Sequence, residues 1–276
     1  MVEPMGIAGP AWATVISQGV SGVLCVLYMK RKYDILRLKK EDLMPDRRCI
    51  GRLLYIGIPM GLQYSITAIG SLVLQSAVNV LGSTYVASSA TAIKISMFFT
   101  CPFDALGSTA ATYAGQNIGA GKLDRISKGL RDAIIIGAVY SAVALIVMLL
   151  FGKNLAYIFL EEPSELLMRN TSMYLTCNAI FYMGLCLVNT IRFLIQGMGY
   201  SVLSIAAGVF EMIARGFAGL VLVPKYGYIA ACLASPLAWV LADIFLILAY
   251  IVIMKRLKNE SFSLQKRVKT ISAAAR

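Results

Sequence analysis

Seven long apolar stretches dominate the sequence, and they constrain its fold more than any other feature. They cover residues 6–29, 53–80, 84–114, 133–152, 166–191, 200–223 and 228–254. Each reaches the roughly 20 predominantly apolar residues that an α-helix needs to cross the hydrocarbon of a bilayer. Only 14% of the residues are charged, against about a quarter in an ordinary soluble chain. We therefore expect an all-α integral membrane protein with about seven transmembrane helices, and the pattern excludes a soluble globular domain.

The residue types argue against an enzyme. The sequence has no histidine, which excludes Ser-His-Asp and Cys-His catalysis and His-ligated zinc. Its six cysteines show no CxxC spacing, and we interpret them as structural. GAGK at 119–122 matches a phosphate-binding loop only in part, because Gln116 stands where the motif needs its first glycine. We expect neither an enzyme nor a cofactor or metal centre.

The positions of the basic residues predict how the helices are oriented. Cytoplasmic connections of membrane proteins carry most of the Lys and Arg. Of the 26 basic residues, 21 follow the first, third, fifth and seventh predicted helices, and three lie on the other side. We expect the N-terminus outside and the C-terminus in the cytoplasm, with membrane lipid around the helices. The net charge of +12 then reflects topology, and no nucleic-acid partner is expected.

The only two tryptophans lie in matching contexts, which indicates an internal repeat. GPAW at 9–12 and SPLAW at 235–239 each open an apolar helix that ends in basic residues. The two helices are six helices apart and run in the same direction, as in a parallel repeat of six-helix halves. We therefore predict three parts. They are the last helix of a first lobe with a basic cytoplasmic loop at 1–52, a six-helix second lobe at 53–254 and a basic cytoplasmic tail at 255–276.

Four short motifs resemble the multidrug and toxic compound extrusion (MATE) transporters. They are GIP at 57–59, TYAGQNIGAGKLDRI at 112–126, IQGMGYS at 195–201 and EMIAR at 211–215. The resemblance is to the C-terminal half of that family, and it implies a two-lobed, twelve-helix antiporter that exports organic cations in exchange for Na⁺ or H⁺. The family's first five helices are absent from the sequence. The resemblance therefore also implies a missing N-terminal lobe or a second copy as partner, in the plasma membrane of a bacterium.

The fifth predicted helix carries a polar stripe that lipid would not accept. Its polar residues recur at three- and four-residue steps, which places them within about 80° on one face. The stripe consists of Thr171, Tyr174, Asn178, Tyr182, Asn189, Arg192 and Gln196. A second polar series on 53–80 starts at Gln63 and Thr67.

We predict a substrate cavity in which ring faces attract a cation and amides orient polar atoms. Its candidate residues are Gln63, Thr67, Tyr174, Asn178, Tyr182 and Asn189. The alternative is that the stripe only forms hydrogen bonds between helices.

Five charged residues fall in the interior of the predicted helices, away from the helix ends where Arg169 lies. Each needs a partner or water, because a charge near the membrane centre costs at least about 2.5 kcal/mol. Glu211 and Arg215 are one turn apart, and we interpret them as a structural ion pair. Asp104 is the first candidate for coupling to Na⁺ or H⁺, followed by Lys94 and Asp243; a fixed structural partner is the alternative for Asp104. MATE members with a sodium site in this lobe place carboxylates in two helices whose counterparts here contain none in the core, which argues against such a site.

Three other functions compete with the antiporter. A lipid-linked oligosaccharide flippase of the same superfamily would need a more cationic cavity than two positive and three negative intramembrane charges provide. A seven-helix receptor would share the topology, but the last predicted helix lacks the lysine of a retinal-type receptor and long outer loops are missing. A truncated, non-transporting remnant stays open, because a polar stripe would survive in it for some time.

Overall fold

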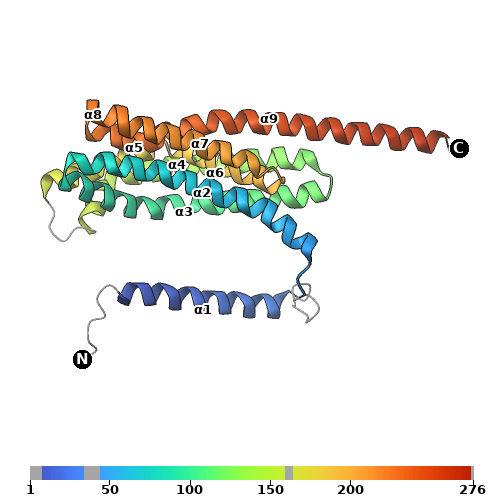
Figure 1. Ribbon diagram of the computed structural model, residues 1–276, viewed down its shortest axis with the longest axis horizontal. Helices are drawn as coiled ribbons and strands as arrows, with labels where there is room; N and C mark the ends of the chain where they lie inside the picture. Colours follow the sequence, from blue (N-terminus) through green and yellow to red (C-terminus); the bar gives the residue numbers. More distant parts are fainter. Residues whose placement is uncertain (1–7, 34–43, 159–163, 275–276) are drawn as a thin grey trace. The chain divides into compact units, whose positions relative to one another are not determined.

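The computed structural model describes residues 8–33, 44–158 and 164–274. Every regular element among them is a helix, which confirms the all-α prediction (Figure 1). A short π-helical turn at Ala218–Leu222 connects the helix Val202–Phe217 to the helix Val223–Tyr226, and the three together form one span. The helices are α1 (Ala8–Lys32), α2 (Arg47–Leu81), α3 (Ser83–Gly119), α4 (Leu123–Ile158), α5 (Glu165–Ile180), α6 (Tyr182–Gly197), α7 (Val202–Phe217), α8 (Val223–Tyr226) and α9 (Tyr228–Ala274).

The helix lengths and composition agree with a multi-pass membrane protein. Six helical segments are long and apolar enough to cross a bilayer, and α5 and α6 form a seventh when the bent pair is taken as one span. Large apolar side chains on α4 point away from the rest of its unit, as lipid contact requires: Ile135, Val139 and Ile146 are each more than half exposed. The predicted count of about seven spans is therefore confirmed.

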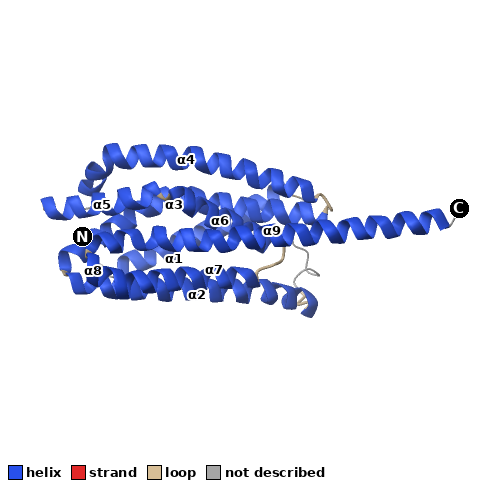
Figure 2. Ribbon diagram, turned by 90° about the horizontal axis from the view of Figure 1, so that it is seen from above, coloured by secondary structure: helices blue, strands red, loops and turns tan. Residues whose placement is uncertain are grey.

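The chain divides into two compact units, Met1–Leu53 and Leu54–Arg276. The first contains α1, whose last turn carries three basic residues. The second contains the rest of α2 and all later helices. Within it, α3 packs against α4, α5 and α6, while α9 packs against α5, α6 and α7 (Figure 2). Phe103, Tyr182 and Trp239 form an aromatic cluster between these helices, with ring centroids 5.8 and 6.5 Å apart.

The connection between α3 and α4 is much shorter than predicted. The sequence suggested a basic loop from 115 to 132, but α3 continues to Gly119 and α4 begins at Leu123. Gly121 adopts φ of 68°, and the Lys122 N–H donates to the Asn117 carbonyl at 2.8 Å, which is a typical glycine-terminated helix end. The GAGK segment is therefore a tight turn between two helices.

The fifth predicted helix is broken. The sequence pattern suggested one helix over 166–191, but α5 ends at Ile180, α6 starts at Tyr182 and their axes differ by 53°. Phe181 between them has φ −103° and ψ 12°, outside the helical range. The last helix also differs from the prediction, because α9 runs to Ala274 through the residues assigned to a tail. The residues after 254 include many good helix formers and no proline or glycine, so nothing stops the helix there.

Candidate functional site: a polar cavity in the second unit

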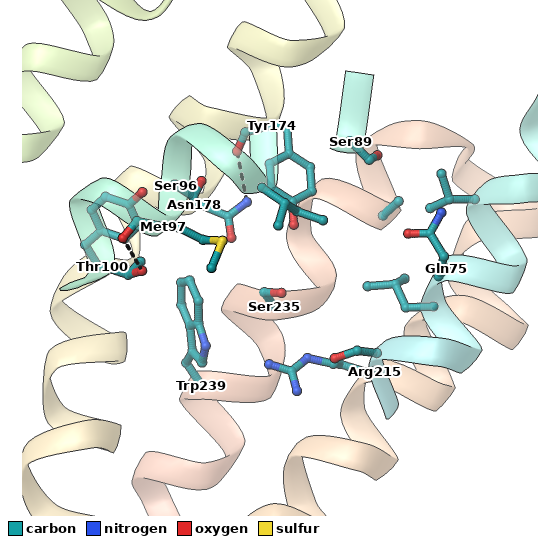
Figure 3. A pocket seen from close by; sticks show the side chains of 16 residues that line it. Gln75, Ser89, Ser96, Met97, Thr100, Tyr174, Asn178, Arg215, Ser235 and Trp239 are labelled. Atoms are coloured by element: carbon teal, nitrogen blue, oxygen red, sulfur yellow. Dashed lines mark hydrogen bonds between the residues drawn. The ribbon is translucent and has the colours of Figure 1, made fainter. Parts of the chain in front are cut away.

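A cavity of about 360 Å³ opens between α2, α3, α5, α6, α7 and α9 (Figure 3). Five hydroxyl side chains, two amides and three aromatic rings contribute to its wall. These are Ser71, Ser89, Ser96, Thr100 and Ser235, the amides Gln75 and Asn178, and the rings Tyr174, Tyr182 and Trp239. The volume lies at the lower end of the range typical of small-molecule sites.

Three of the six predicted substrate residues line this cavity: Tyr174, Asn178 and Tyr182. Asn178 is held in place because its amide donates to the carbonyls of Tyr174 at 2.9 Å and Cys232 at 3.3 Å. Tyr182 is fully buried at the start of α6, where the break at Phe181 turns it toward Phe103 and Trp239. The helix break thus positions a ring in the cavity wall.

The other three predicted substrate residues lie elsewhere. The Gln63 side chain accepts a hydrogen bond from the Gln196 amide at 2.9 Å, and Asn189 donates to Asp104 at 2.7 Å. The Thr67 hydroxyl is buried between helices and lies outside the cavity wall. The stripe is therefore divided: Tyr174, Asn178 and Tyr182 line the cavity. Further along α6, Asn189, Arg192 and Gln196 form hydrogen bonds to neighbouring helices.

The predicted coupling residues are found in different surroundings. Asp104 lies on the exposed side of α3 and accepts from the Asn189 amide, whereas Lys94 is exposed about two turns before Pro102. Asp243 is 7% exposed on α9, and its Oδ1 has no hydrogen-bond partner among the described residues. Within the described part of the chain, no three His, Cys, Asp or Glu side chains gather as a metal-ligand set.

The structural ion pair has a third member. Glu211 contacts Arg215 at 3.3 Å, as the spacing suggested, and its other oxygen accepts from Arg192 on α6. The charge distribution assigns Arg192, just after the fifth predicted helix, to a cytoplasmic turn; this assignment is wrong, because Arg192 lies within α6 and is only 6% exposed. Two guanidinium groups therefore share one buried carboxylate.

Sequence reasoning missed part of the cavity wall, including Ser235, Trp239 and the guanidinium of Arg215. In Figure 3 the Arg215 side chain extends toward Trp239, on the same side of the cavity as Ser235. A periodicity signal did exist for two of them, because Ser235, Trp239 and Asp243 recur at four-residue steps on one face of the last helix. For Arg215 the sequence pattern gives no such signal, because an arginine one turn after Glu211 is equally consistent with a purely structural ion pair.

The charge of the wall opposes a simple organic cation. A positive group about 5 Å from a guanidinium is repelled by about 3 kcal/mol at an effective dielectric constant of about 20. A cation over an aromatic face gains only about 0.5–2 kcal/mol. The Glu211 carboxylate offsets part of the repulsion, but it lies outside the wall and is shared with Arg192. Arg215 therefore disfavours a cation placed directly beside it.

The family of this chain follows from its sequence and fold together. The family model MatE matches residues 59–218, which include most of the cavity wall. This chain belongs to the MatE family. It is 32% identical over 179 residues to the probable multidrug resistance protein YpnP of Bacillus subtilis, covering 64% of this chain and 39% of that protein. The multidrug export protein MepA of Staphylococcus haemolyticus is 22% identical, covering 74% of this chain and 45% of that protein.

Solved structures show the same fold. A multidrug resistance MATE family transporter of the MOP superfamily in an outward-facing conformation gives a TM-score of 0.81 at 22% identity, over 92% of this chain and 58% of that one. A MOP superfamily transporter from Pyrococcus furiosus also gives 0.81, at 20% identity, over 92% and 57%. This MatE-family chain spans less than half the length of the curated relatives above. Family membership excludes the receptor, and the comparisons do not favour the oligosaccharide flippase.

Proposed function

We propose that this chain is one lobe of an alternating-access antiporter that exports drug-like organic molecules in exchange for Na⁺ or H⁺. The observation that carries the proposal is the polar, aromatic cavity inside a unit of membrane-spanning helices with the MATE fold. The names of the related proteins in Bacillus and Staphylococcus support drug-like substrates. A transport function, rather than a catalytic one, agrees with the family.

The proposed mechanism needs a second lobe. In alternating access, two lobes rock against each other and expose a shared site to one side of the membrane at a time. The matched region is 38–45% of the curated relatives' length, and one lobe encloses only half of such a pathway. We propose that an N-terminal lobe or a second copy supplies the rest.

We propose Asp104 as the first coupling residue. Its carboxylate lies on an exposed side of α3, where the Asn189 amide donates to it at 2.7 Å. Because lipid would not accept a charge there, we infer that this side of α3 faces water and the second lobe, from which an ion or proton can bind. Binding of a cation or proton there would change the charge of this face and so bias which state of the transporter is populated. Asp243, buried on α9, is the second candidate.

The proposed orientation has the N-terminus outside and the C-terminus in the cytoplasm of a bacterial cell. The asymmetric distribution of basic residues supports this orientation. Relatives from Bacillus and Staphylococcus support the bacterial plasma membrane.

The test is transport in proteoliposomes that contain this chain, with and without a co-reconstituted MATE N-terminal lobe. The readout is movement of a fluorescent aromatic dye under an imposed Na⁺ or pH gradient. We expect gradient-dependent transport that falls at least about tenfold in Asp104→Asn, since the neutral amide keeps the shape but loses the ion site. Asp132→Asn, at an exposed ion pair with Arg131, is the matched control and should transport normally.

The absence of gradient-dependent transport in both preparations, with the chain correctly inserted, would overturn the export function. Equal loss in Asp104→Asn and Asp132→Asn would overturn the assignment of Asp104 only.

A further inference from the structure

Arg215 is the one side chain in the cavity wall that carries a full charge at neutral pH. The remaining lining residues are apolar, hydroxyl-bearing, amide-bearing or aromatic. Arg215 is only 8% exposed, so its guanidinium is largely shielded from bulk solvent where it borders the cavity. A ligand in the cavity therefore meets a guanidinium and no carboxylate.

The charge of Arg215 is incompletely matched within the protein. Glu211 is its partner at 3.3 Å, but this carboxylate also binds Arg192. The Arg215 Nη1 is buried and makes no hydrogen bond to any described residue, because the ion-pair contact is not aligned with its N–H groups. Asp243 on α9 interacts electrostatically with Arg192 and Glu211, the other two members of this cluster.

The surroundings of Arg215 define what could complete its bonding. An arginine side chain presents several N–H donors in a planar fork that fits a carboxylate. Ser235 and Gln75 add a hydroxyl and an amide to the wall, and the rings of Tyr174 and Trp239 form flat apolar surfaces (Figure 3). The arrangement suits a flat ring system with one anionic group, within a volume of about 360 Å³.

We propose that this cavity binds aromatic molecules that carry a carboxylate or similar anionic group, either as organic anions or as zwitterions, and that Arg215 selects the anionic group. The physiological meaning of this selectivity, export of such molecules, rests on the function proposed above. The binding itself does not depend on transport.

The first test uses the unaltered chain in lipid nanodiscs. An environment-sensitive aminocoumarin carboxylate is titrated against its ethyl ester, which has the same rings without the charge, and against an acridinium cation of similar size. Empty nanodiscs correct for partition into lipid. We expect the carboxylate to bind about 10- to 100-fold more tightly than the ester, as hydrogen bonds to a charged group predict. Equal or tighter binding of the ester or the cation would overturn the proposal.

Two variants then separate selection from structure. Arg215→Gln and Glu211→Gln both break the same buried ion pair. We expect the Arg215→Gln variant to bind the carboxylate no better than the ester. We expect the Glu211→Gln variant to bind the carboxylate more tightly than the unaltered chain, because the Arg215 guanidinium then loses a competing partner. If Arg215 had a purely structural role, the two variants would change the affinity for the carboxylate in the same direction. That result would contradict the proposal.

The result is distinct from the outcome of the transport assay. Selective binding of the carboxylate without any transport would contradict only the proposed export function. Gradient-driven transport of ester and carboxylate with equal apparent affinity would contradict only the selectivity of Arg215.

Discussion

At the scale of single residues, the main feature is the shared carboxylate of Glu211. Arg192 and Arg215 both bind it, and all three side chains are less than a tenth exposed. Buried charges of this kind are stable only as a set, because removing one member leaves another uncompensated. Glu211 therefore joins α6 to α7 as well as holding the arginine of the cavity wall.

We predict that the members of this cluster differ in their effect on stability. Arg192→Gln should lower the free energy of unfolding by about 3 kcal/mol, and Glu211→Gln by more, because two buried guanidinium groups then lose their counter-ion. Arg131→Gln is the control: its ion pair with Asp132 is exposed and should contribute at most about 1 kcal/mol. Unfolding by SDS in mixed micelles measures all three. An equal loss in Arg192→Gln and Arg131→Gln would contradict the cluster's role.

At the scale of elements, α3 and α6 approach each other closely where α6 ends. Gly197 at the end of α6 lies against the backbone of Ala111 on α3, where an added Cβ would overlap the Ala111 carbonyl. Glycine is required here by the close approach of two helices, as is common in membrane proteins. The motif IQGMGYS therefore has a packing reason for its first glycine.

Substitution of this glycine should separate the two helices. We predict that Gly197→Ala destabilises the chain by about 1–3 kcal/mol, since backbone must move to make room. Gly216→Ala on α7 is the matched control, because no heavy atom lies within 4 Å of an added Cβ there. It should be neutral or gain up to about 1 kcal/mol of helix stability. Thermal unfolding followed by tryptophan fluorescence measures both, and equal midpoints would contradict the close crossing.

The element scale also shows what the sequence could predict. The lengths of the apolar stretches were enough to locate the spans, since the thickness of the bilayer sets how many apolar residues a helix needs to cross it. The break between α5 and α6 could not be predicted from local sequence, because neither proline nor glycine occupies residues 180–182. The break coincides with the burial of Tyr182 against Phe103 and Trp239, rings that come from distant helices. A tertiary contact of this kind leaves no periodic signal.

The same limit applies to the candidate site. The stripe placed Tyr174 and Asn178 on a polar face that must avoid lipid, and both side chains line the cavity. The stripe could not separate side chains that face the cavity from Asn189 and Gln196, which bond to other helices. Helical periodicity defines a face, and only packing decides what covers it.

At the scale of the whole molecule, the two sides of the membrane are defined by short turns. Lys122 lies in the turn between α3 and α4, and Lys225 lies in α8 just before α9. Both side chains are exposed. Three spans separate them when α5 and α6 count as one, and an odd number of crossings places them on opposite sides of the bilayer.

This arithmetic leads to a topology prediction that tests the span count and the orientation together. In a background without the six native cysteines, a membrane-impermeant maleimide added to intact cells should label Lys225→Cys and leave Lys122→Cys unlabelled. Both variants should react after the membrane is dissolved. The physical reason is the excess of basic residues near Lys122, which retains that turn in the cytoplasm. The reverse labelling pattern would invert the orientation, whereas labelling of both from one side would show that the bent α5 and α6 pair re-enters the membrane rather than crossing it.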